Sequence, residues 1–192
     1  MKSFFRRIRH RIIVKELAIP ENAAILDTSC QDGGFLSALI KNSNGKNLKV
    51  YGVDLIGADI EKAKKLIPKG FFEITDNASL PFPDQTFDIV ISSFTLHHMA
   101  NPISSIKEMA RVVKNGGIIY LIDIIAENKI FNFILKRMKC PEPYHFEKYY
   151  SFEEIKNLLS KTGLTIDKKI KAAAFPSFTI FTPISILELS QK

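Results

Sequence analysis

Short runs of β-branched residues alternate with longer stretches of helical period, and this alternation is the strongest constraint on the fold. The runs that predict strands are 23–27, 47–55, 71–75, 87–93 and 118–125, and the stretches that predict helices are 34–41, 58–67 and 102–113. Strands that alternate with helices usually pair in parallel through right-handed crossovers. The near-continuous apolar run FDIVISS indicates a strand covered on both faces. We therefore expect an α/β fold with a doubly wound, mostly parallel sheet.

The last third of the chain predicts a different ending for this sheet. Ser151 precedes Glu154 by the capping-box spacing of a helix start, and Gly163 is suited to end that helix. Two further strands are expected at 164–170 and 173–183, and their closeness in sequence favours an antiparallel pair. The predicted architecture is a seven-stranded, Rossmann-like doubly wound sheet with an antiparallel last strand.

The length of the chain limits the number of domains, and its charge limits the classes of binding partner. The 192 residues fit one domain, 1–192, in which segment 1–20 forms an N-terminal helical cap. The net charge is +7, but lysines and arginines are spread along most of the chain, which is typical of solvated helix faces and disfavours nucleic acid as a partner. The basic N-terminal segment fits three roles equally: a cover over the site, a peripheral contact with an anionic membrane, or a contact with an acidic partner.

Cysteine usage and hydropathy indicate the compartment. Cys30 and Cys140 are far apart and form no CxxC pair, which argues against a disulfide scaffold and against a structural zinc site, and no metal site is predicted. No apolar stretch approaches the roughly 18 residues of a membrane-spanning helix, and no secretory signal follows the basic N-terminus. A cytoplasmic location is expected, and the sequence favours no particular oligomeric state.

Two features at the predicted strand ends suggest a nucleoside site. The turn after the first strand runs DTSCQDGG from Asp27 and opens a helix, so its small residues and free N–H groups suit a ligand; a plain strand-to-helix connection is the alternative. Asp54 follows about twenty residues later at the end of the second strand, where a carboxylate accepts hydrogen bonds from ribose hydroxyls. The alternative for Asp54 is an exposed loop acid. The chain contains neither a GxGxxG fingerprint nor a P-loop.

A specific resemblance comes from the segments around the fourth strand. Residues 75–88 read TDNASLPFPDQTFD, residues 89–98 read IVISSFTLHH, and residues 108–117 read EMARVVKNGG. These segments resemble the class I methyltransferases, in particular the branch that makes ubiquinone and menaquinone. The resemblance extends over 23–125, with a weaker similarity in 150–163. It implies S-adenosylmethionine as the cofactor and a small molecule as the methyl acceptor.

The resemblance implies four residues at the methionine end of the cofactor. Asp27 would hold the turn and, through water, the cofactor's amino group. Ser29 and Gly33 lie in the turn, and Gly33 would let the methionine group pass close to the backbone. Ser92 would offer its backbone carbonyl to the ammonium group.

The resemblance also implies four residues at the adenosine end. Asp54 would accept the ribose hydroxyls, with Leu55 beside it. Asp76 would accept from the exocyclic amine of adenine, and the backbone N–H of Asn77 would reach a ring nitrogen. Carboxylates and carbonyls suit this cofactor because it is a cation with several donors.

The first motif departs from the family pattern at Ser29 and Gln31, where glycine is usual. A long side chain in a turn that needs positive φ costs about 1 kcal/mol or more. The alternative function that this departure suggests is a catalytically inactive protein that binds S-adenosylmethionine or another nucleoside.

Methyl transfer is an in-line displacement that needs a base only for a protonated acceptor. His97 and His98 are the candidate catalytic residues, and the alternative is that they cap and pack. The family's Pro-Pro motif for amine acceptors is absent at 92–95, which favours an oxygen, carbon or sulfur acceptor, including a lipophilic one. The aromatic segment 127–150 is predicted to be a substrate lid, with a satellite hydrophobic cluster as the alternative. The net charge leaves an RNA methyltransferase as a further alternative.

Overall fold

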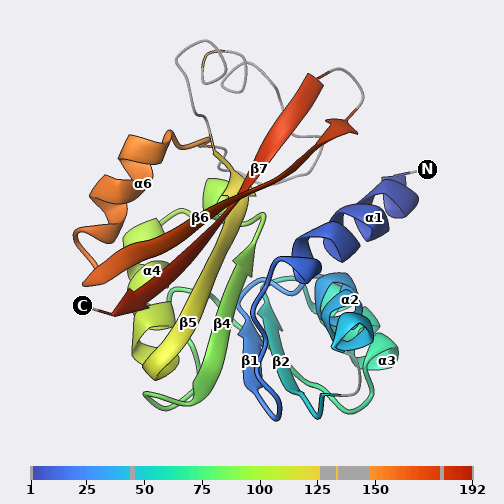
Figure 1. Ribbon diagram of the computed structural model, residues 1–192. Helices are drawn as coiled ribbons and strands as arrows, with labels where there is room; N and C mark the ends of the chain where they lie inside the picture. Colours follow the sequence, from blue (N-terminus) through green and yellow to red (C-terminus); the bar gives the residue numbers. More distant parts are fainter. Residues whose placement is uncertain (1, 44–45, 126–132, 134–147, 178–179, 192) are drawn as a thin grey trace.

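The computed structural model describes residues 2–43, 46–125, 133, 148–177 and 180–191, with side chains described from Arg6 onward and outside 173–183. Over these residues the strands form one seven-stranded sheet in the order β3-β2-β1-β4-β5-β7-β6 (Figure 1). The strands are β1 Ala24–Asp27, β2 Lys49–Asp54, β3 Phe71–Ile74, β4 Phe87–Ser93, β5 Val113–Ile124, β6 Leu164–Ser177 and β7 Ile180–Gln191. The helices are α1 Lys2–Lys15, α2 Gly34–Asn42, α3 Gly57–Leu66, α4 Pro102–Val112 and α6 Phe152–Leu159, with a 3-10 turn, η1, at Leu96–His98.

The strand order reverses between β1 and β4. Strand β1 pairs in parallel with β2 on one side and with β4 on the other, and β3 and β5 extend the parallel sheet outward. In such a sheet the loops on either side of the reversal diverge and leave a crevice at the carboxyl ends of the strands. The predicted doubly wound architecture is confirmed, and it determines where a ligand site can form.

Helices cover both faces of the sheet, which explains the nearly continuous apolar strands. Ile25 and Ile89 belong to a core shared with α1, α2 and α3, whereas their neighbours Leu26 and Val90 belong to a second core shared with α4 and α6. All four side chains are fully buried. Because successive strand residues face opposite sides, a sheet with two covered faces needs apolar residues at every position.

The carboxyl-terminal third has the expected antiparallel pairing, but one strand was predicted in the wrong place. Strand β7 lies between β5 and β6 and runs antiparallel to both. The segment 173–183, predicted as one strand, instead contains the end of β6, the connection and the start of β7. Pro183 is tolerated in β7 because pairing with β5 begins only at Ile184, so no ladder donor is lost on that side.

Local helix signals were predicted accurately. The Ser151 Oγ accepts from the Glu154 N–H at 3.3 Å, and the Glu154 carboxylate accepts from the Ser151 N–H at 2.8 Å, which completes the capping box. Gly163 has φ +75° after the end of α6. Residues 114–117, between the predicted helix 102–113 and the predicted strand 118–125, belong to β5 and form a register break, where Phe87 pairs with Val113 but Ile89 pairs with Ile118. Among the described helices, none has the length and apolarity to cross a bilayer.

Candidate functional site

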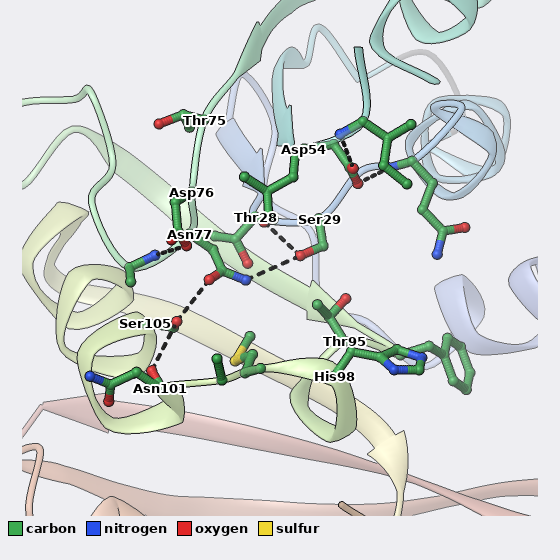
Figure 2. A pocket seen from close by; sticks show the side chains of 17 residues that line it. Thr28, Ser29, Asp54, Thr75, Asp76, Asn77, Thr95, His98, Asn101 and Ser105 are labelled. Carbon is green, nitrogen blue, oxygen red and sulfur yellow. Dashed lines mark hydrogen bonds between the residues drawn. The ribbon is translucent and has the colours of Figure 1, made fainter. Parts of the chain in front are cut away.

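A pocket opens at the carboxyl ends of β1, β2 and β4, beside the reversal of strand order (Figure 2). Four segments line it: the turn after β1, the end of β2, residues 75–78 after β3, and the segment after β4 that leads into α4. Of the predicted cofactor residues, the pocket brings together Ser29, Asp54, Leu55, Asp76 and Asn77. Asp27, Gly33 and Ser92 are not among the lining residues.

The turn after β1 is held to both neighbouring strands. The Thr28 N–H donates to the Ile91 carbonyl of β4, and the Cys30 N–H donates to the Val53 carbonyl of β2, each at 2.9 Å. Gln31 lies in the left-handed region with φ 47°, as expected where the family has glycine. Its side chain lines the pocket. The turn therefore keeps the backbone shape that glycine would favour, at the cost of strain at Gln31.

Asp54 connects this turn to the start of α3. Its Oδ2 accepts from the Gln31 N–H at 2.9 Å and its Oδ1 from the Ile56 N–H at 3.0 Å. Burial raises the pKa of the Asp54 carboxyl, and the bonds from the Ile56 and Gln31 N–H groups partly oppose that rise. A carboxylate has about four acceptor sites. Asp54 can therefore hold the turn and still accept hydroxyl groups from a ligand.

The segment after β3 forms the opposite side of the pocket. Asp76 is exposed, and its Oδ1 accepts from the Ala78 N–H at 2.9 Å. The Asn77 side-chain amide donates to Ser29 Oγ at 3.4 Å and accepts from Ser105 Oγ at 2.8 Å (Figure 2). The Asn77 side chain thus joins the β1 turn to α4, a bridging role that sequence reasoning did not predict.

Asp27 lies directly under the turn and is fully buried. Its Oδ1 accepts from the Ser29 N–H at 3.2 Å, whereas its Oδ2 has no hydrogen-bond partner among the described residues. Burial is the main cause that raises the pKa of Asp27 to about 7. The buried Ser92 Oγ at the end of β4 also lacks a described partner. Unsatisfied buried oxygens next to a pocket are acceptors that a ligand or water can satisfy.

Gly33 serves the packing of two helices. It precedes α2 with φ +74°, and a Cβ there would lie 3.1 Å from the Cα of Ala63 in α3. The close approach of α2 and α3 therefore accounts for glycine at this position. A direct contact between Gly33 and a ligand remains a prediction.

The two candidate catalytic histidines have different surroundings. His98 lines the pocket, whereas His97 is buried, outside the lining, with its Nδ1 2.7 Å from Asp123 Oδ1 and its ring stacked on Tyr149. Asp123 was missed by sequence reasoning, although an acid inside the apolar run IIYLIDII could have indicated a buried partner. The predicted lid at 127–150 lies almost wholly outside the described residues; Phe133 is exposed, and Tyr149 and Tyr150 are buried.

The charge of the pocket differs from that of the chain. The acidic side chains among its lining residues are those of Asp54 and Asp76, and no described lysine or arginine lines it. In a chain of net charge +7, this pocket disfavours a phosphate and favours a cation with several hydrogen-bond donors. S-adenosylmethionine has that chemistry, and the unsatisfied Asp27 Oδ2 fits its donors.

Comparisons with known proteins agree with this geometry. Residues 26–121 match the family described as a methyltransferase domain. The chain is 35% identical over 124 residues to a demethylmenaquinone methyltransferase of Anoxybacillus flavithermus, covering 60% of this chain and 51% of that protein. It is 32% identical over 108 residues to the 2-methyl-6-phytyl-1,4-hydroquinone methyltransferase of Synechocystis sp., covering 55% of this chain and 33% of that protein. The chain thus spans about half the length, or less, of these relatives.

A solved structure supports the fold. The chain superposes on a SAM-dependent methyltransferase from Aquifex aeolicus with a TM-score of 0.71 at 21% identity, covering 97% of this chain and 96% of that one. At this identity the similarity concerns the arrangement of helices and strands.

Proposed function

The chain belongs to the methyltransferase domain family, and from this premise we propose that it transfers a methyl group from S-adenosylmethionine to a small molecule. The observation that carries the proposal is Asp54, a carboxylate held at the end of β2 by two backbone N–H groups in a pocket whose lining carries acidic side chains and no lysine or arginine among the described residues.

Each part of the pocket has a proposed cofactor role. Asp54 would accept the two ribose hydroxyls, with Leu55, 68% exposed, as an apolar surface beside the base. Asp76 and the Asn77 backbone would bind adenine, since both lie in the segment after β3. Asp27 and the Ser92 carbonyl, at the ends of adjacent strands, would receive the ammonium group, with Gly33 and Ser29 in the turn between them and α2.

The chemistry would take place at the end of the pocket formed after β4. When bound, S-adenosylmethionine supplies an electrophilic methyl group on a sulfonium. Phe94 and Met99 would exclude water from the acceptor and orient it, which is the main requirement of an in-line displacement. His98 would take a proton from an acceptor that is protonated at working pH, and the Asp123–His97 pair would hold the adjacent residue in position.

We propose a hydroquinone-like or other lipophilic hydroxyl, carbon or thiol acceptor. Support comes from the names of two relatives, a demethylmenaquinone and a phytylhydroquinone methyltransferase, and from the apolar side chains after β4. The acidic lining does not favour RNA phosphates at this pocket.

The test is calorimetric titration with S-adenosylmethionine and S-adenosylhomocysteine. Wild-type protein should bind both in the micromolar range, and Asp54→Asn should weaken binding at least about tenfold because a neutral amide replaces a charge-assisted acceptor. Asp59→Asn is the matched control, since Asp59 is in the first turn of α3, pairs with Lys62 and does not line the pocket. Methyl transfer from labelled cofactor to hydroquinones, catechols and thiols then tests turnover.

Each result has a distinct consequence. Absence of binding to the wild-type protein would refute the cofactor site. Equal weakening by Asp54→Asn and Asp59→Asn would refute the role of Asp54. Binding without turnover on any acceptor class would favour the inactive binder that Gln31 suggests.

A further inference from the structure

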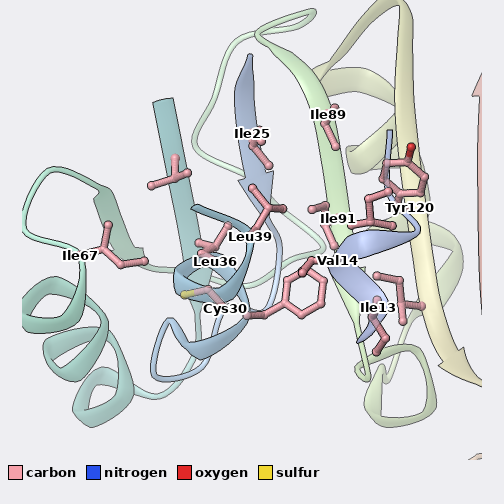
Figure 3. Close-up of a cluster of buried hydrophobic side chains, with 14 of the residues drawn as sticks. Ile13, Val14, Ile25, Cys30, Leu36, Leu39, Ile67, Ile89, Ile91 and Tyr120 are labelled. Carbon is pink, nitrogen blue, oxygen red and sulfur yellow. The ribbon is translucent and has the colours of Figure 1, made fainter. Parts of the chain in front are cut away.

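Helix α1 packs against the sheet beside the pocket and is fixed there by contacts near both of its ends. Ile13 and Val14 are buried in the core with strands β1 and β4 (Figure 3), and Tyr120 Oη accepts from the Ala18 N–H at 3.0 Å just after the helix. Nearer the amino terminus, Arg6 forms an ion pair with Asp32 of the turn after β1. The side chains between these anchors therefore have defined positions relative to the pocket.

Arg9 is placed by this helix against a residue of the pocket. Its guanidinium carbon lies 3.9 Å from the ring centroid of Phe94, which lines the pocket. Among the described residues, the buried Arg9 Nε has no hydrogen-bond partner, and no carboxylate is within ion-pair distance of the guanidinium. Arg7 and Arg11 of the same helix are exposed. Arg9 is thus a half-buried cation that forms no ion pair with the described residues.

A half-buried charge that forms no ion pair costs free energy of folding, so the position of Arg9 needs a reason. Burial, and next the nearby Arg6, lower the pKa of Arg9 to about 10, but the side chain is still charged at neutral pH. Asp123 exerts an opposing attraction from farther away, and its carboxylate is already engaged by His97. Buried charges in proteins are usually paired, and an unpaired one next to a pocket is explained most simply by a ligand that supplies the counter-charge.

The location of Arg9 also separates it from the acids of the pocket. Phe94, Thr95 and His98 come from the segment after β4, whereas Asp54 and Asp76 come from the ends of β2 and β3. Figure 2 shows Thr95 and His98 at the far side of the pocket from Asp76. An anionic group is therefore disfavoured at the β2–β3 end of the pocket and favoured at the Phe94 end.

We propose that Arg9 is the receptor for a ligand carboxylate that enters the pocket at its Phe94 end. The planar guanidinium presents paired donors that match a carboxylate, and its carbon lies over the Phe94 ring. This inference rests on the proposed function for the identity of the ligands. Two molecules can supply this carboxylate: the cofactor, through its methionine part, and a methyl acceptor that is itself a carboxylic acid.

Two ligand pairs distinguish these sources. S-adenosylhomocysteine carries the carboxylate and 5′-methylthioadenosine lacks it; 1-naphthoate carries a carboxylate and 1-naphthamide does not. If the cofactor supplies the carboxylate, Arg9→Gln lowers the affinity for S-adenosylhomocysteine at least about tenfold, since charge-assisted hydrogen bonds contribute about 1.5–3 kcal/mol. The affinity for 5′-methylthioadenosine is then unchanged. If the acceptor is the source, the same variant leaves the cofactor product unchanged and abolishes the preference for naphthoate over naphthamide. Each naphthalene titration is run with and without S-adenosylhomocysteine.

Two further variants separate a receptor from a structural residue. Arg7→Gln removes an equal charge from the exposed face of α1 and should change the affinity for neither S-adenosylhomocysteine nor 1-naphthoate. Arg9→Lys keeps the charge without the paired donors and should retain part of the carboxylate preference. Thermal unfolding confirms that each variant is folded.

The proposal is overturned if Arg9→Gln leaves the affinity for both carboxylate ligands unchanged, or if it lowers the affinity for carboxylate and neutral ligands equally. It is also overturned if Arg7→Gln lowers the affinity for a carboxylate ligand as much as Arg9→Gln does. Failure of the wild-type protein to bind S-adenosylhomocysteine refutes the proposed function, while the naphthoate titration without cofactor still tests Arg9. If the wild-type protein binds neither S-adenosylhomocysteine nor 1-naphthoate, both the proposed function and the role of Arg9 are overturned.

Discussion

Replacing Asp27 by asparagine should change the stability of the protein in a manner that depends strongly on pH. Asp27 is fully buried, and its pKa is raised from an ordinary value of 3.8 to about 7. A carboxyl group whose pKa is higher in the folded state binds its proton more tightly there. Its contribution to stability is therefore complete below about pH 4 and is lost as the pH rises toward 7. An asparagine side chain does not titrate, so the Asp27→Asn variant lacks this loss.

The size of the effect follows from the two pKa values. The loss amounts to about 1.4 kcal/mol per pH unit between the two values, or about 4 kcal/mol in total. The buried amide adds a pH-independent cost of about 1–3 kcal/mol, because the described residues offer no partner at the position of Oδ2. The stability of Asp27→Asn minus that of wild type should therefore increase by about 2–3 kcal/mol between pH 5 and pH 8, whatever the cost of the amide.

Urea unfolding at pH 5, 6, 7 and 8 measures this difference directly. The variant must be compared with wild type because a second group also makes stability depend on pH. Burial lowers the pKa of His10 to about 4, so the contribution of His10 to stability is lost as the pH falls from about 6.5, the opposite direction to Asp27. That contribution cancels in the difference. Ser160→Ala, which removes no titratable group and lies at the end of α6, is the control and should give a difference that does not vary with pH. A constant difference for Asp27→Asn would refute the reasoning.

Four further substitutions test individual features. Gln31→Gly should relieve left-handed strain of about 1 kcal/mol, partly offset by chain entropy, and leave affinity for S-adenosylhomocysteine unchanged or tighter by calorimetry; a clear loss of stability in urea would contradict this. Gly33→Ala should cost at least about 1–2 kcal/mol in the same urea assay, and a neutral effect would show that α2 and α3 can separate. Ser151→Ala should cost about 1 kcal/mol, with Ser160→Ala beyond α6 as a milder control. Asp123→Asn should change the His97 imidazole nitrogen shifts in NMR and lower stability by about 1–3 kcal/mol, and unchanged shifts would exclude the pair in solution.

The hydrophobic pattern predicted two parts of the candidate site, the turn after the first strand and Asp54, whereas the resemblance to methyltransferases supplied Ser29, Leu55, Asp76 and Asn77. Asp54 and Asp76 each follow a short apolar run, and parallel strands bring such ends to one edge of the sheet. Ser29, Leu55 and Asn77 lie in the pocket for the same reason. The positions of Asp27 and Ser92 outside the pocket lining were not predictable, since strand ends indicate which edge a residue reaches but not whether its side chain is buried.

The sequence by itself determined most local elements of this protein: where helices begin and end, and which strands are covered on both faces. It did not determine the turn between β6 and β7, which lies inside the segment predicted as one strand. The elements that it did determine depend on residues within a few positions of one another, such as the Ser151–Glu154 box. Only the tertiary structure decided the pairs that join distant segments: Asn77 with Ser29, His97 with Asp123, and Arg9 with Phe94. The physical reason is that burial and unsatisfied charge depend on every element packed around a group, and helical or strand periodicity contains no record of those neighbours.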